Sequence, residues 1–512
     1  MDRAGFRLHR LPGDQGPRRL PRHLHRHRPH RGTAAAGRHP AGAARAAASL
    51  RTLVDRAQAR PHAAQEPPPS HPSGRRARWL ERWLERWFEG KWEWALGALS
   101  TTSTTTTATT AGEAARRARD CFSPQQRQWL GALREDLHRH PELSLHEQRT
   151  ADRLERALRE LGAADVRRIA GTGVVARIPG RSREVLPPVA VRGDIDALPI
   201  QEETGLAYAS EVAGVMHACG HDVHASWAVG AAMLLLQEPA CGDVLVVLQP
   251  AEEIGTGALE VLRSGALDDV AAIFGAHVDR RWEVGQVVVQ EGPLAAATDE
   301  FDVVLTGGGG HGARPHLTRD PIVAGAALVQ ALQTLVSRRV DPGEPAVVTV
   351  GSFQGGAAAN VIPERVELRG TLRSCSPLVR QQLIDELRQL SQDVARAHRV
   401  DAEVRLHGGT PPIVNPAPAT GWARVAATRL LGAQALVPMP EVNMGGEDFA
   451  FYLERTAGCF VRVGAREPGG EVIGAHTPRF HADLGALWVG SALLAETARE
   501  ASRALSSPGS DG

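Results

Sequence analysis

The chain of 512 residues has five cysteines, one lysine and no run of about 18 apolar residues. The cysteines are few, odd in number and widely spaced, which excludes a disulfide-stabilised scaffold and indicates a reducing compartment. The missing apolar run excludes a hydrophobic membrane span. The basic N-terminus also lacks the apolar segment of a secretory signal peptide. We therefore expect a cytoplasmic protein.

Acidic residues are scarce only in the first part of the chain. Residues 1–78 contain 17 arginines and 4 acidic residues, whereas the whole chain has a net charge of +1. Because residues 1–78 alone carry +13, the remaining residues carry −12. An acidic body of this length is large enough for two or three domains and argues against nucleic-acid binding.

Residues 1–121 have a composition that does not support a packed core, so we predict a disordered extension there. Arginine, histidine and proline dominate residues 21–31, and serine and threonine dominate residues 100–110. Between them, three tryptophans spaced four residues apart share one face of a predicted helix: Trp79, Trp83 and Trp87. This segment is interpreted as a membrane-surface or partner-binding helix, as a short helix in a disordered extension, or as the product of a start codon assigned too far upstream. A disordered tail is predicted over 506–512.

From Phe122 onward, short apolar runs alternate with helical segments. Two amphipathic helices are predicted within 123–161. Apolar runs bounded by turn residues predict strands at 172–178, 189–192, 244–249 and 271–276. Helices are predicted between some of these strands, at 222–237 and 257–265. The alternation is typical of an α/β sheet, which we assign to residues 122–298 and 413–505.

Residues 299–412 form a separate block. Their pattern predicts a strand, a helix, two strands, a second helix and a last strand. The order βαββαβ is typical of a ferredoxin-like module. We therefore predict that this module is inserted into the α/β domain.

Polar residues follow three of the predicted strands. Asp194 and Asp196 follow the strand at 189–192, Glu252 and Glu253 follow the next, and His277 follows the strand ending at 276. In open α/β sheets, ligands bind outside the carboxyl ends of the strands. The sequence therefore predicts a metal or proton-transfer site at this edge.

The segment His217-Ala-Cys-Gly-His-Asp-Val-His224 carries the strongest chemical signal. Thiolate and imidazole ligands suit zinc and similar transition metals. On a helix, Cys219 and His221 would point about 200° apart, but a turn at the intervening glycine lets both reach one ion. Asp222 is expected to cap the helix that follows. In the adjacent pair Glu252 and Glu253, one carboxylate can bind metal while the other moves protons, and the residues alone do not say which.

A run of four glycines precedes His311. The run lacks the Lys-Ser/Thr ending of a phosphate-binding P-loop. A flexible loop that presents one histidine is better suited to gripping a substrate.

Residues 122–505 resemble the di-metal amidohydrolases that include hippurate hydrolases, N-acyl-amino-acid amidohydrolases and indole-acetyl-amino-acid hydrolases. The family belongs to the wider aminoacylase and carboxypeptidase superfamily. Its resemblance implies a di-zinc-exopeptidase-like catalytic domain with a mixed central sheet, and a ferredoxin-like module that mediates dimerisation. The motifs that carry the resemblance lie at 137–143, 192–199, 217–224, 250–253, 309–316, 360–363, 370–373, 444–449 and 476–480.

The resemblance also implies the roles of individual residues. Two divalent metal ions would share five ligands: Cys219 as the bridge, with His221, Glu253, His277 and His476. Glu252 would be the general base, acting on a metal-bridging water, and Asp196 would orient the site. His311 would reach the active site of a partner subunit and stabilise the oxyanion.

Asn360 and Arg373 match residues that hold the carboxylate or carbonyl of the substrate, although a turn cap and a surface charge explain them equally well. The implied activity is hydrolysis of the amide bond of an N-acyl amino acid, with zinc, manganese, cobalt or nickel as the metal. A metallo-exopeptidase acting on dipeptides would use the same machinery. A catalytically silent binding protein would lack a ligand or the base, and none is missing.

Overall fold

The structure is a computed structural model that describes residues 110–506. The predictions for residues 1–109, including the tryptophan-rich helix, and for residues 507–512 lie outside this range. Within it, helix α3 (Ala111–Asp120) corrects the predicted extent of the N-terminal extension. Thr110 caps this helix by accepting the Glu113 N–H. Ala114 and Ala118, one turn apart, are buried in the main core. The alanine-rich segment, whose composition resembles that of a disordered extension, therefore forms a helix that packs through its small side chains.

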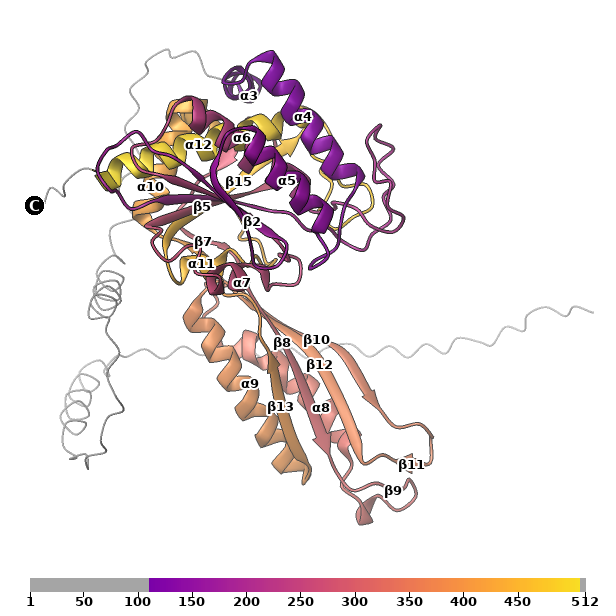
Figure 1. Ribbon diagram of the computed structural model, residues 1–512. Helices are drawn as coiled ribbons and strands as arrows, with labels where there is room; N and C mark the ends of the chain where they lie inside the picture. Colours follow the sequence, from indigo (N-terminus) through magenta and orange to yellow (C-terminus); the bar gives the residue numbers. More distant parts are fainter. Residues whose placement is uncertain (1–109, 507–512) are drawn as a thin grey trace, which may run out of the picture. The chain divides into compact units, whose positions relative to one another are not determined.

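The first domain is built on a seven-stranded sheet in the order β1-β2-β4-β3-β5-β15-β6 (Figure 1). β3, β4, β5 and β15 run parallel, whereas β1, β2 and β6 pair antiparallel. This arrangement confirms an α/β fold with a mixed central sheet. The strands are β1 (Ala164–Ile169), β2 (Gly173–Ile178), β3 (Val189–Asp194), β4 (Val244–Gln249), β5 (Ala272–Glu283), β6 (Val287–Val288) and β15 (Ala457–Arg466).

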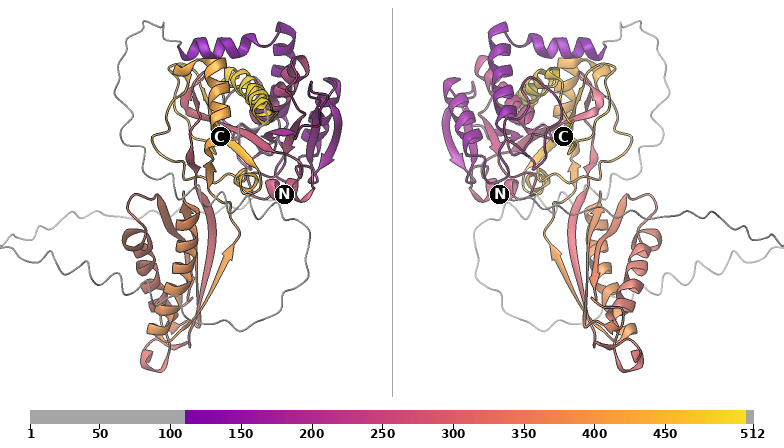
Figure 2. Two further views of the ribbon diagram at one scale, coloured as in Figure 1. Left: turned by 90° about the vertical axis from the view of Figure 1, so that its left-hand side faces the viewer. Right: turned by 90° about the vertical axis from the view of Figure 1, so that its right-hand side faces the viewer.

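Helices and short strands cover the two faces of this sheet (Figures 1 and 2). Alternate residues of β5 separate two cores: Phe274, Ala276 and Val278 face the first, and Ile273 faces the second. On the first face lie α3, α4 (Pro124–Arg139), α5 (Gln148–Glu160), α6 (His221–Gln237), α10 (Ala417–Leu431) and α12 (Leu484–Ser506). On the second lie α7 (Gly257–Arg263), α11 (Ala450–Leu453), β7 (Gly292–Ala295) and β14 (Ile413–Asn415).

The inserted module has a four-stranded antiparallel sheet in the order β10-β12-β8-β13. Its chain order βαββαβ confirms the ferredoxin-like prediction. Two helices pack on this sheet around a third core (Figure 2). The elements are β8 (Ala297–Thr306), α8 (Pro321–Thr334), β10 (Ala346–Gly355), β12 (Arg365–Ser374), α9 (Pro377–His398) and β13 (Asp401–His407).

A small two-stranded sheet pairs β9 (Gly310–His311) with β11 (Val361–Ile362). Three short helical segments complete the described chain, at Pro315–Leu317, Leu335–Arg339 and Ala433–Ala435. Within residues 110–506, no helix combines the length and the apolarity needed to cross a membrane.

Two expectations about the first domain are wrong. His277 does not follow a strand but lies inside β5, because β15 continues to pair with β5 beyond the point where β3 ends. Asp222 does not cap α6, because Gly220 occupies the N-cap with φ of 87°. Instead, Asp222 is buried and accepts a hydrogen bond from Nε of Arg134 at 2.7 Å.

Candidate metal centre

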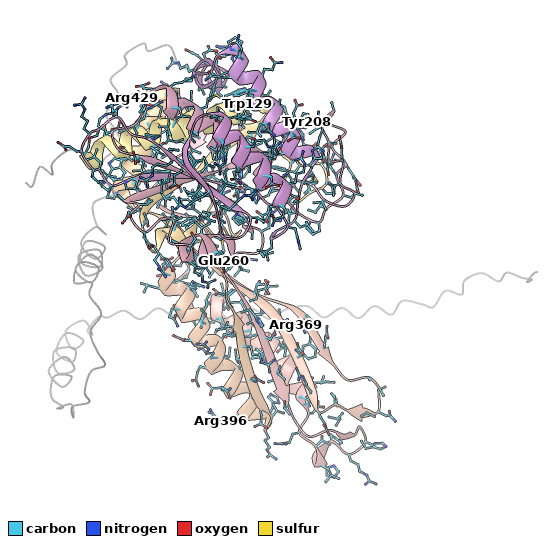
Figure 3. All side chains as sticks on the ribbon, viewed as in Figure 1. Trp129, Tyr208, Glu260, Arg369, Arg396 and Arg429 are labelled. Carbon is cyan, nitrogen blue, oxygen red and sulfur yellow. The ribbon has the colours of Figure 1, made fainter. Side chains whose placement is uncertain are left out.

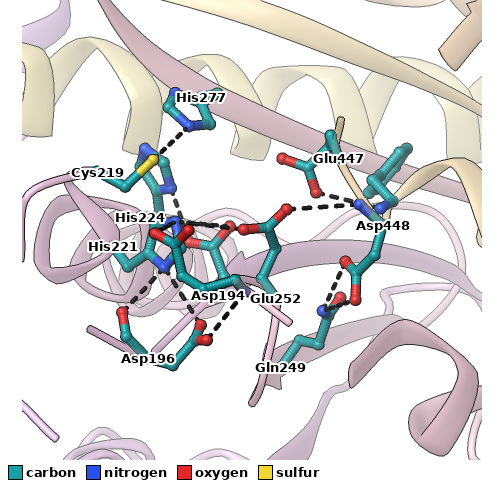
Figure 4. A network of polar contacts seen from close by, with 12 residues as sticks. Asp194, Asp196, Cys219, His221, His224, Gln249, Glu252, His277, Glu447 and Asp448 are labelled. Atoms are coloured by element: carbon teal, nitrogen blue, oxygen red, sulfur yellow. Dashed lines mark hydrogen bonds and ion pairs between the residues drawn. The ribbon is translucent and has the colours of Figure 1, made fainter. Parts of the chain in front are cut away.

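The five predicted ligands lie together at the carboxyl edge of the central sheet, and Figure 4 shows Cys219, His221 and His277 among them. Cys219 Sγ lies 3.3 Å from His277 Nε2. His476 Nε2 lies 3.4 Å from Glu253 Oε2, and His221 Nε2 lies 3.7 Å from Glu253 Oε1. The chain positions that supply these residues span more than half of the sequence, so the fold itself assembles the cluster.

The ligands form two overlapping groups. Cys219, His221 and His277 make one, and Cys219, Glu253 and His476 make the other, with the donor atoms of each group within 4.8 Å of one another. Cys219 belongs to both groups, which is the arrangement expected of a residue that bridges two ions. Sulfur, imidazole nitrogen and carboxylate oxygen are together the donor set of zinc-type sites.

Two donor atoms of the cluster have no hydrogen-bond partner within the described chain. Nε2 of His221 and Oε1 of Glu253 are buried and form no hydrogen bond. Buried polar atoms of folded proteins are nearly always hydrogen-bonded or bound to an ion. These two atoms point at a common location, since they lie 3.7 Å apart. The residues present therefore fit two divalent cations.

Backbone conformation at Gly220 and His476 helps to position the predicted ligands. The positive φ of Gly220 lets the chain turn between two ligands just before α6 begins. His476 has a φ of 62°, which is strained for a residue with a side chain. Its backbone N–H donates to the carbonyl of Ala218 at 2.8 Å, so the two ligand-bearing segments are tied together directly.

Asp196 contacts two of the predicted ligands, His221 and Glu253. Its carbonyl oxygen and Oδ1 lie 2.9 and 3.2 Å from Nδ1 of His221, which leaves Nε2 facing the cluster. Its Oδ2 accepts the N–H of Glu253 at 3.0 Å and the hydroxyl of Ser144 at 2.7 Å. One buried carboxylate thus positions two ligands.

His224 is close to the cluster but is already engaged. The N–H of Val278 donates to Nε2 of His224 at 3.0 Å, so the ring proton is on Nδ1, which lies 2.7 Å from Oδ1 of Asp194. The ring stacks on Trp227 with centroids 4.5 Å apart. Both nitrogens of His224 therefore already have hydrogen-bond partners.

Burial dominates the electrostatics of the two glutamates. It raises the pKa of Glu252 well above the usual range, and the charges of Glu447, Asp448 and Glu253 add to this effect. Burial also raises the pKa of Glu253 to about 7, although His221 opposes the shift. The same cause raises the pKa of the Cys219 thiol well above its ordinary value. A cation that binds here must displace protons from these groups.

A second buried carboxylate cluster contains Glu252 and two residues for which the sequence analysis predicts no role. Glu252, Glu447 and Asp448 lie within 4.8 Å of one another, and the Asp448 N–H lies 3.4 Å from Oε1 of Glu252. Arg192 donates to Glu447 and Asp448 at 3.1 and 3.0 Å. The sequence contained a signal, because Arg192 ends an apolar run in the same motif as Asp194, but its partners lie more than 250 residues away.

The three predicted residues of the inserted module are not part of the cluster. His311 lies on β9 and Asn360 just before β11, and the Gly312 N–H donates to the Asn360 carbonyl at 2.7 Å. Arg373 lies at the other end of the module, paired with Thr298 at the start of β8. Within residues 110–506, no hydrogen bond or ion pair joins His311, Asn360 or Arg373 to the five ligands.

Comparisons with known proteins agree with this geometry. The chain is 40% identical over 379 residues to an N-acetyl-L-cysteine deacetylase of Bacillus subtilis, covering 74% of this chain and 89% of the relative. It is 38% identical over 380 residues to an IAA-amino acid hydrolase of Arabidopsis thaliana, covering 72% and 85%. The crystal structure of a dinuclear metal-binding M20 peptidase from Bacillus subtilis superimposes with a TM-score of 0.65 at 38% identity, covering 73% and 97%. The model of peptidase family M20/M25/M40 matches residues 190–500. The chain therefore belongs to the M20 peptidase family, within its amidohydrolase and aminoacylase group.

Proposed function

We propose that the protein is a metal-dependent amidohydrolase that cleaves the amide bond of N-acyl amino acids. The observation that carries this proposal is the position of Glu252, whose carboxylate lies 3.8 Å from His221 Nε2. Glu252 shares a donor group with His221 and Glu253 but belongs to neither group that contains Cys219. The relatives named as a deacetylase of N-acetyl-L-cysteine and as an IAA-amino acid hydrolase support this substrate class.

The five ligands would hold two divalent cations, and we propose zinc, manganese, cobalt or nickel. When bound, such ions polarise a carbonyl and acidify water. Cys219 would hold both ions, with His221 and His277 on one side and Glu253 and His476 on the other. Asp196 keeps His221 in the tautomer and orientation that present Nε2.

Glu252 would be the general base. It would take a proton from the attacking water as the oxygen forms a bond to the amide carbon, and would give that proton to the nitrogen as the C–N bond breaks. Burial and the neighbouring carboxylates raise its pKa, which favours the protonated carboxyl group that donates to the leaving nitrogen. The products are a carboxylic acid and a free amino acid.

We propose that the protein acts as a homodimer joined through the inserted module. β10 is an edge strand of the four-stranded sheet. Four large apolar side chains on β10 and α8 are exposed: Ile322, Val323, Val347 and Phe353. An unpaired edge with apolar side chains favours association with a second copy.

His311 lies at the end of the inserted module that is far from the chain connections, because β8 begins at the connection and His311 follows its far end (Figure 1). In a dimer, we propose that His311 stabilises the oxyanion in the active site of the partner subunit. Asn360 lies beside His311, and we propose that it binds the substrate at the same end of the module. We propose that Arg373 binds the substrate at the opposite end of the module.

A substrate panel on metal-reconstituted protein tests the proposal. It compares hippurate, N-acetyl amino acids and simple dipeptides by kcat/KM. We expect the N-acyl amino acids to be cleaved faster than the dipeptides. Faster cleavage of dipeptides would favour the metallo-exopeptidase alternative, and no cleavage by protein with two metals per chain would refute both.

A cytoplasmic location is the remaining part of the proposal. It rests on cysteine chemistry, since all five cysteines are free, and a reducing compartment keeps them so.

A further inference from the structure

Two buried arginines lie on one face of the central sheet, on the two sides of β5. Arg192 on β3 pairs with Gly275, and Arg462 on β15 pairs with His277. Gly275 and His277 are two residues apart, so they lie on the same face of β5. Paired residues of neighbouring strands also share a face. Arg192, His277 and Arg462 therefore project from the same side of the sheet, near the metal centre.

The two guanidinium groups differ completely in their partners. Arg192 donates to Gln249 at 2.8 Å, Asp194 at 2.5 Å, Glu447 at 3.1 Å and Asp448 at 3.0 Å.

Arg462 is 3% exposed, and its Nε is buried without a hydrogen-bond partner. Within the described chain, its guanidinium forms no hydrogen bond and no ion pair, and its ring contact is with Phe460 at 5.6 Å from the centroid.

The two carboxylates whose charges act most strongly on Arg462 form hydrogen bonds with other arginines. Asp279 and Glu447 are the acidic groups that act on it most strongly. Asp279 accepts from Nε and Nη2 of Arg281 at 2.8 to 3.1 Å, and Glu447 accepts from Arg192. Among residues 110–506, the guanidinium of Arg462 beside His277 is thus a buried positive charge that forms no ion pair. A folded protein retains such a charge at a cost, and a ligand that supplies the missing acceptors explains why it is there.

We propose that Arg462 binds a carboxylate group of the substrate next to the metal centre. The proposal rests on the proposed amidohydrolase function, which places an N-acyl amino acid beside His277. A guanidinium presents parallel N–H groups that match the two oxygens of a carboxylate. The carboxylate has three possible sources: the α-carboxylate of the amino acid, an acidic amino-acid side chain, or an acyl group that ends in a carboxylate.

Matched substrate pairs distinguish these sources, because the two members of each pair differ by one charge. N-acetylalanine and its amide test the α-carboxylate. N-acetylglutamate and N-acetylglutamine test the side chain, and N-succinylalanine and N-acetylalanine test the acyl group. We expect wild-type protein to prefer the charged member of at least one pair by about tenfold or more in kcat/KM. Arg462→Met removes that preference, Arg462→Lys restores part of it, and Arg429→Met, an exposed arginine on α10, preserves it.

Preferences that survive in Arg462→Met in all three pairs would overturn the inference while leaving the amidohydrolase function intact. If none of the N-acyl substrates is cleaved, the proposed function fails instead. Calorimetric titration with succinate and with glutamate then decides the inference separately. Binding by wild-type protein that is lost in Arg462→Met supports it, and equal binding or none by both proteins overturns it.

Thermal stability separates a ligand-binding role from a structural one. Removing an unpaired buried charge should raise the melting temperature of the ligand-free protein. Removing a paired one, in Arg192→Met, should lower it. A lower melting temperature for Arg462→Met would show that the fold itself uses the guanidinium, and would overturn the inference.

Discussion

Asp196 holds Glu253 through its backbone: Oδ2 of Asp196 accepts the Glu253 N–H at 3.0 Å, while Oδ1 lies 3.2 Å from Nδ1 of His221. The ends of two neighbouring strands are thereby fixed by one carboxylate. This relationship explains how a loop after β4 and the first residue of α6 present donor atoms to the same space.

Replacing Asp196 with alanine should weaken metal binding by about 10- to 100-fold, because His221 and Glu253 both lose their orientation. Ser144→Ala is the matched control, since it removes one hydrogen bond to the same carboxylate, and its effect should be within about threefold. Competition with a chromogenic chelator measures both affinities. Equal affinities for the alanine variant and the wild type would contradict a positioning role.

Cys219→Ala should reduce bound metal below one ion per chain, because Cys219 belongs to both donor groups. Cys241→Ala, at a partly exposed free cysteine, should keep the wild-type content. Elemental analysis of purified protein gives the metal content per chain. Two ions per chain in Cys219→Ala would exclude the bridging role.

Metal affinity should rise with pH, and more steeply below pH 7 than above it. Burial raises the pKa of Glu253 to about 7 and that of the Cys219 thiol well above 9. A cation therefore displaces a proton from Glu253 mainly below pH 7. It displaces protons from the Cys219 thiol and from His221, whose pKa is also raised, both below and above pH 7. Affinities measured at pH 6, 7 and 8 check this change in slope. An affinity that does not depend on pH would contradict it.

His138 should stabilise the fold more at pH 6 than at pH 9. Burial opposes its charged form, but the charge of Asp222, 2.9 Å from Nδ1, raises its pKa above 6.5 overall. A raised pKa means that the stabilisation is complete below pH 6.5 and is lost as pH rises through the folded-state pKa. His138→Gln should therefore lower the free energy of unfolding by about 1–3 kcal/mol at pH 6 and by less at pH 9. Urea unfolding at the two pH values measures this, and a loss that grows with pH would refute it.

Periodicity and motif spacing predict most of the fold. The strands at β2, β3 and β4 and the order βαββαβ of the inserted module follow from apolar runs and turn residues, which depend on local sequence. The apolar runs and turn residues do not predict β15 as a separate strand, and its pairing explains why β5 continues beyond His277. Long-range pairing of this kind has no local signature.

The partners of buried charged side chains are harder to predict from the sequence than the positions of helices and strands. Asp222 has the right place and chemistry for a helix cap, yet it is buried against Arg134, which the sequence places 88 residues earlier. Glu447 and Asp448 follow the same pattern, because their partner Arg192 lies on β3. Figure 3 shows the side chains of the described residues on the ribbon, with Arg369, Arg396 and Arg429 among those labelled. Buried ion pairs depend on tertiary packing, so spacing alone does not reveal them.

The measurement that tests the account most directly is the activity of Glu252→Gln on an N-acyl amino acid, together with its metal content. The amide keeps the shape of the side chain but cannot take a proton, so we predict full metal content with kcat reduced by about 10³-fold or more. Activity within about tenfold of wild type, a barrier change of only ~1.4 kcal/mol, would contradict the assignment of Glu252 as the base.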